Sequence, residues 1–101
     1  MNTDTHLSSS YTMKIAFLED DAAFAANIIE WLEQAGHEVT WFRSGRECVR
    51  ALSDARYDLC LFDWMLPDMN GPDVMANLKL KGTLPPVIFL TGRDAEEDVV
   101  Q

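Results

Sequence analysis

Three apolar runs in this sequence are each followed by side chains that carry oxygen. The first run is followed by Glu19, Asp20 and Asp21, the second by Asp63 and the third by Thr91. Ligands of parallel α/β proteins bind outside the carboxyl ends of the strands, where the strand order reverses. Carboxylates gathered there raise one another's pKa unless a cation lies between them. The sequence therefore predicts a divalent-metal site with one carboxylate left for chemistry.

The residue types at this predicted site favour phosphoryl chemistry. Oxygen ligands without a neighbouring His or Cys suit Mg²⁺ or Mn²⁺ better than zinc, and Mg²⁺ leaves room for a phosphate oxygen. A carboxylate beside the metal can attack phosphorus and hold an acyl phosphate, and the hydroxyl of Thr91 can then bond to the phosphoryl oxygens. Taken singly, each acid can also be a solvated loop charge or a helix N-cap. The occurrence of these acids and the Thr91 hydroxyl together at three strand ends favours the metal site.

The elements that must position these acids alternate between strand and helix. Such alternation predicts an α/β fold, in which right-handed crossovers place helices on both faces of a parallel sheet. We expect strands over 14–18, 38–42, 58–62 and 87–90, and helices over 22–35, from 45 to about 54, after 71, and from 94.

Two packing predictions follow from the apolar pattern. The first helix should face the core with one stripe that includes the large side chain of Trp31; the stripe consists of Phe24, Ile28, Trp31, Leu32 and Ala35. Cys48 and Cys60 have neither metal-site nor redox spacing. We expect both to be buried, reduced thiols, as in a cytoplasmic protein.

Size and charge exclude several classes of partner. The chain has 101 residues, which suits one small domain, and its 17 acidic and 8 basic residues give a formal charge of −9. Nucleic acid and anionic membrane surfaces need a basic face, so we expect direct binding to neither. Residues 1–12 are polar and lack the apolar stretch of a signal peptide, which predicts a flexible tail before a domain over 13–101.

Three segments also resemble a known family. Residues 17–21 (FLEDD), 61–71 (LFDWMLPDMNG) and 89–93 (FLTGR) are similar, in order and spacing, to the receiver domain of two-component response regulators. The resemblance covers residues 14–101. It implies a flavodoxin-like three-layer fold and a signalling domain rather than an enzyme.

The resemblance assigns a role to each site residue. Asp63 would accept a phosphoryl group from a histidine kinase, and Asp20 would bind Mg²⁺ directly, with Glu19 acting through water. The backbone carbonyl of Met65 would be a further metal ligand, and Thr91 would be the switch hydroxyl. Asp21 is expected mainly to cap the first helix. Phosphorylation would then control an output domain, of the DNA-binding kind, that these residues do not include.

Part of the family pattern has no counterpart here. Receivers end with a fifth strand, followed by a Lys that reaches the phosphoryl oxygens, and a fifth helix. No segment of this sequence supplies them, so the receiver is expected to be truncated within its fourth helix. The strand over 87–90 would then be an open edge, and we expect the exposed face to form a homodimer or larger oligomer.

Other functions remain open from the residues. One is a degenerate receiver that acts only as a binding or dimerisation module. Another is a Mg²⁺-dependent phosphatase with an aspartyl nucleophile; phosphatases of the haloacid dehalogenase type have a second Asp two residues later, where this chain has Met65. A flavodoxin-like cofactor binder would need a phosphate-binding loop after the first strand, and Glu19, Asp20 and Asp21 would repel a phosphate.

Overall fold

The computed structural model describes residues 12–64, 66 and 68–90. Within these residues, strands and helices alternate as the sequence predicts. The elements are β1 (Lys14–Leu18), α2 (Ala22–Gln34), β2 (Glu38–Phe42), α3 (Gly45–Asp54), β3 (Leu59–Asp63), α4 (Gly71–Lys81) and β4 (Val87–Leu90).

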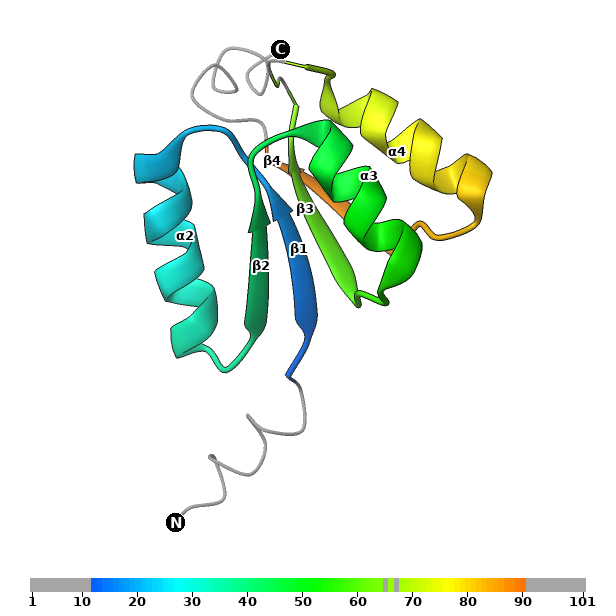
Figure 1. The fold of residues 1–101 in the computed structure, drawn as a ribbon. Coiled ribbons are helices and arrows are strands. Elements are labelled where there is room, and N and C mark those ends of the chain that lie inside the picture. The colour runs from blue at the N-terminus through cyan, green and yellow to red at the C-terminus, as the bar shows by residue number, and fades with distance from the viewer. Residues whose placement is uncertain (1–11, 65, 67, 91–101) are drawn as a thin grey trace, which may run out of the picture.

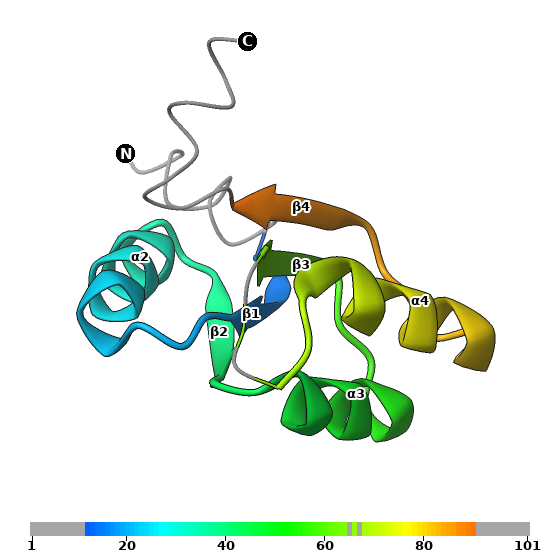
Figure 2. The same ribbon diagram turned by 90° about the horizontal axis from the view of Figure 1, so that it is seen from above.

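The four strands form one parallel sheet in the order β2-β1-β3-β4. Helix α2 covers one face of the sheet, and α3 and α4 lie together on the other (Figures 1 and 2). The predicted three-layer α/β fold is confirmed. The expected fourth helix, from residue 94, lies outside the described residues.

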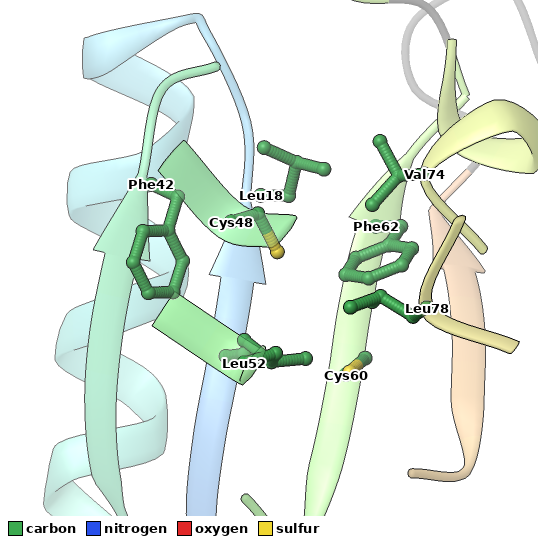
Figure 3. Packing of buried hydrophobic residues seen from close by; sticks show 9 residues of the cluster. Leu18, Phe42, Cys48, Leu52, Cys60, Phe62, Val74 and Leu78 are labelled. Carbon is green, nitrogen blue, oxygen red and sulfur yellow. The ribbon is translucent and has the colours of Figure 1, made fainter. Parts of the chain in front are cut away.

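The larger part of the core lies between the sheet and the α3–α4 layer (Figure 3). Both cysteines belong to it, and the prediction that they are buried free thiols is confirmed. Burial raises the pKa of the Cys60 thiol to about 12 and raises that of Cys48 further, with the charge of Cys60 contributing. The buried members of this cluster are Ala16, Leu18, Phe42, Cys48, Leu52, Cys60, Phe62, Val74 and Leu78.

The other face of the sheet packs against α2 through a smaller cluster. Ala25 is fully buried there, and Ile28, Ile29 and Leu32 are partly buried beside it. The prediction that Trp31 lies in the core is wrong, since 66% of its surface is exposed. The stripe 25-28-29-32 satisfies the same helical spacing as the predicted one. Ile28 and Leu32 belong to both stripes, whereas the predicted member Ala35 is exposed. The sequence pattern did not single out Ala25, because its small side chain carries less apolar signal than an aromatic one.

Each helix begins at a side-chain cap. Asp21, Ser44 and Asn70 each accept a hydrogen bond from the backbone N–H three residues further on, at 3.0 to 3.2 Å. These caps satisfy N–H groups that have no partner within the helix. At its far end α4 terminates at Gly82, whose φ of 74° lies in the left-handed region that favours glycine.

Asp68 ties the loop between β3 and α4 to the start of α3. Its carboxylate accepts hydrogen bonds from the backbone N–H of Gly45 at 3.0 Å and of Arg46 at 3.1 Å. The Gly45 hydrogen bond, followed by those from Arg46, Asp68 and Met69, lowers the pKa of this carboxyl. Gly45 is packed so closely that an added Cβ would lie 2.8 Å from the Met69 sulfur. The loop and the helix are therefore held as one unit.

Two leucines on α4 allow a matched test of this packing. Leu78 is fully buried and Leu80 is 89% exposed. We expect Leu78→Ala to lower the free energy of unfolding by about 2–5 kcal/mol, because it leaves a cavity in the core. Leu80→Ala should change it by less than about 0.5 kcal/mol. Urea unfolding followed by circular dichroism measures both, and equal losses would contradict the assigned helix faces.

The Asp68 contact predicts a pH-dependent stability. We expect Asp68→Asn to lower the free energy of unfolding at pH 7 by about 0.5 kcal/mol, because the amide keeps one acceptor oxygen but loses the negative charge and the second hydrogen bond. Because the folded pKa of Asp68 lies below its unfolded value, the ionised form stabilises the fold above the unfolded pKa, and this contribution is lost as pH falls through the folded value. The difference between parent and variant should therefore shrink below about pH 4. Asp54→Asn, on the exposed end of α3, is the control.

Candidate functional site: an acidic cluster at the carboxyl edge of the sheet

The strand order places the site between the two central strands. The chain leaves β1 toward β2 on one side and reaches β3 on the other, so the order reverses between β1 and β3. Leu18 pairs with Phe62 across these strands. Glu19 and Asp63 are the residues that follow this pair, so they come level at the carboxyl edge. A reversal of this kind is where parallel sheets bind ligands.

Glu19, Asp20 and Asp63 form one carboxylate cluster. Each offers an oxygen that lies within 4.8 Å of the oxygens offered by the other two. Glu19 is fully buried, Asp63 is 5% exposed and Asp20 is partly buried. Three carboxylates this close favour a bound cation, and an all-oxygen donor set with room for water fits Mg²⁺ or Mn²⁺. The cluster therefore could hold a divalent metal, as the sequence predicts.

The remaining predicted residues are not part of the cluster that the structure describes. Asp21 caps α2 with its carboxylate, as expected, and it is not a member of the cluster. Met65 and Thr91 lie outside the described residues, so the roles predicted for them stay predictions.

The backbone around Glu19 is fixed by the end of β2. The Glu19 N–H donates to the Phe42 carbonyl at 3.0 Å, and the Trp41 indole N–H donates to the Glu19 carbonyl at 2.8 Å. The Arg43 guanidinium donates to the Asp20 carbonyl at 3.0 Å, and its carbon lies 5.3 Å from the Trp41 ring centre. The hydrogen bond from Trp41 to the site has no signal in the sequence, because it depends on the β1–β2 register.

The Glu19 side chain is oriented from its own loop. Its Oε2 accepts a hydrogen bond from the Asp21 N–H at 3.0 Å. Asp21 thus orients one acid of the cluster through its backbone while its side chain starts α2. The hydrogen bond fixes the direction in which the Glu19 carboxylate points within the cluster.

Asp63 lies against the start of α4. A Cβ added at Gly71 would lie 2.6 Å from the Asp63 carbonyl oxygen and 2.7 Å from a ring carbon of Phe89. The Gly71 N–H also donates to the Trp64 carbonyl at 2.8 Å. The Trp64 ring, 46% exposed, packs edge-on against Phe89 at 5.0 Å between centroids. Glycine at position 71 lets α4 approach the strand end that carries Asp63.

Comparison with known sequences identifies the family. The sequence model of the response regulator receiver domain matches residues 15–101. The transcriptional regulatory protein QseB of Escherichia coli O157:H7 is 39% identical over 89 residues, which cover 88% of this chain and 41% of that protein. The response regulator PmrA of Pseudomonas aeruginosa is 36% identical over 88 residues, covering 87% and 40%. The chain thus spans about two fifths of these relatives.

Solved structures agree with the sequence relatives. The receiver domain of the Francisella response regulator 1452 superposes with a TM-score of 0.77 at 27% identity, covering 88% of this chain and 74% of that one. The receiver domain of the sensor histidine kinase PA1611 of Pseudomonas aeruginosa PAO1, with magnesium in its active-site cleft, also gives 0.77 at 27% identity, covering 89% and 75%. Among the described residues, no helix is long and apolar enough to cross a membrane. The family model and these relatives together show that the chain belongs to the receiver domain family of response regulators, the signalling domains of two-component systems.

Proposed function

We propose that Asp63 is the phosphoacceptor of this receiver and takes its phosphoryl group from a phosphohistidine of a histidine kinase. The observation that carries the proposal is the carboxylate cluster, in which Asp63 ends the central strand β3 beside Glu19 and Asp20. Receiver domains as a family interact with histidine kinases and output domains. Asp63 is the one acid of the cluster that β3 carries, whereas Glu19 and Asp20 both follow β1.

The proposed metal is Mg²⁺, with Mn²⁺ as a substitute. Asp20 and Asp63 would bind it with carboxylate oxygens, Glu19 would support it through water, and the Met65 backbone carbonyl would add a ligand. When bound, the metal neutralises charge on the transferring phosphoryl group. A receiver with magnesium in its active-site cleft is among the structural relatives, which supports this choice.

The transfer exchanges one bond to phosphorus for another. An Asp63 carboxylate oxygen forms a bond to phosphorus while the phosphorus–nitrogen bond of the phosphohistidine breaks, and the imidazole nitrogen keeps the electron pair. Glu19 and Asp20 are already held in place by hydrogen bonds from Trp41 and Arg43. Thr91 would move its hydroxyl toward the new phosphoryl oxygens. The added charge would bias the surrounding loops toward a second arrangement.

The proposed consequence is control of an output domain. The relative QseB is a transcriptional regulatory protein and the relative PmrA is a response regulator, and the chain matches about two fifths of each. A DNA-binding output domain is therefore the proposed target of the switch. The chain acts in this scheme as an acceptor and not as an enzyme with turnover. A degenerate receiver that only binds is the second candidate, and the assembled cluster disfavours it.

Intact mass spectrometry tests the phosphoacceptor. After incubation with Mg²⁺ and a small-molecule phosphodonor, we expect one phosphoryl group on the parent and none on Asp63→Asn, because the amide is not a nucleophile. Asp54→Asn is the control, since it makes the same chemical change on an exposed helix end. Chelating the metal should abolish the addition.

Each outcome of that experiment bears on the proposal. Equal labelling of Asp63→Asn would overturn the assignment of the acceptor. No labelling of a folded parent would favour the binding-only receiver. Labelling that survives complete chelation would remove the role proposed for the cluster.

We further propose that the 101-residue chain associates with itself through the face that α2 leaves uncovered. No helix of the described residues covers β4 on this face (Figure 2). Ile88 is 51% exposed there, Trp31 on the neighbouring helix is 66% exposed, and β4 pairs on one side only with β3. Exposed apolar side chains beside an open strand edge favour association.

Light scattering tests this association. We expect a mass above that of the 11.4 kDa monomer at high protein concentration, and a shift toward the monomer in Ile88→Glu, because a charge would have to be buried. Leu80→Glu, on the exposed side of α4, is the matched control and should leave the mass unchanged. A monomeric parent, or equal dissociation of both variants, would contradict the proposed face.

A further inference from the structure

A groove of about 540 Å³ lies between α3 and α4, on the side of these helices away from the site described above. The two helices pack side by side over the sheet (Figures 1 and 2). The groove belongs to no part of the phosphoacceptor site. Its lining residues are Arg46, Val49, Arg50, Ser53, Asp54, Met69, Asn77 and Lys81.

The charge of this groove is opposite to that of the whole chain. Arg46, Arg50 and Lys81 are three of only 8 basic residues, whereas Asp54 is one of 17 acidic residues. Within the part of the chain that the structure describes, none of the three cations forms an ion pair. The groove therefore concentrates unpaired positive charge on a protein whose remaining surface is strongly acidic.

The groove also has an apolar part. Val49 and Met69 are partly buried and pack against the main core cluster, with their remaining surface open to the groove. Methionine adapts its flexible side chain to different apolar contacts. Apolar side chains flanked by cations suit a ligand that is itself apolar on one side and negatively charged along its edges.

The spacing along α3 fits a helical ligand. Arg46, Val49, Arg50 and Ser53 follow the positions i, i+3, i+4 and i+7, so they form one stripe along the helix. At 1.5 Å per residue the stripe is roughly 10 Å long, which is about two helical turns. An amphipathic helix that lies in a groove is read through apolar anchors at this same spacing.

We propose that the α3–α4 groove binds an acidic amphipathic helix of a partner protein. The apolar side of that helix lies on Val49 and Met69, and its carboxylates face Arg46, Arg50 and Lys81. The acidic surface elsewhere on the chain repels such a ligand, which directs it to this groove. The apolar contacts and the surrounding acids make a helix a better ligand than a nucleic acid, whose binding needs a wider basic face.

Fluorescence anisotropy of a labelled synthetic peptide tests the proposal. The peptide is a short helix with leucine along one face and glutamate along both flanks, and the comparison peptide has glutamine in place of every glutamate. We expect the 101-residue chain to bind the glutamate peptide more tightly, with an affinity that falls as salt rises. Arg50→Glu should weaken binding about tenfold, because it replaces an attraction by a repulsion of similar size.

Lys79→Glu is the matched control. Lys79 is an exposed basic residue on α4 that does not line the groove, and its reversal changes the net charge equally. Binding by this variant should equal that of the parent, with circular dichroism showing that both variants fold. Absence of binding, equal affinity for the glutamine peptide, or equal loss in Lys79→Glu would each overturn the proposal. If a single-stranded oligonucleotide of the same charge bound more tightly than the peptide, the ligand of the groove would be a nucleic acid and the proposed helix would be wrong.

Discussion

The close approach of three carboxylates at one edge of the sheet is the constraint on which the structure depends. The parallel pairing of β1 with β3 brings Glu19 and Asp63 level, so the register of these two strands sets how close the acids lie. The apolar side chains of β1 and β3 are buried on both faces of the sheet, and the free energy of this burial opposes the repulsion between the carboxylates. The fold therefore forces together groups that a cation and a phosphoryl group can satisfy.

The end of a neighbouring strand holds this arrangement through its backbone. The end of β2 contributes Trp41 and Arg43, whose donors bind the carbonyls of Glu19 and Asp20. The peptide units that carry these two acids are thus fixed, and the Glu19 carboxylate is also oriented by the Asp21 N–H. Preorganisation of this kind lowers the cost of binding because little has to move.

The loop after β3 links the strand that carries Asp63 to the α3–α4 layer. It begins at Asp63, is tied to the start of α3 through Asp68, and ends where Gly71 brings α4 against the strand. Met69, from the same loop, reaches the groove between the two helices. A change of charge at Asp63 would therefore act on a loop that contacts both α3 and α4. Helix α2, on the opposite face of the sheet, takes no part in these contacts.

The local sequence by itself determined the alternating elements and the acids at the ends of β1 and β3. These features depend on neighbours within a few residues, so spacing and residue type are sufficient to predict them. Only the tertiary structure decided that Ala25 rather than Trp31 faces the sheet, that Trp41 donates to the Glu19 carbonyl, and that Asp68 caps a helix 23 residues earlier. Each of these depends on which elements lie side by side and in what register, and contacts between distant segments leave no periodic signal in the chain.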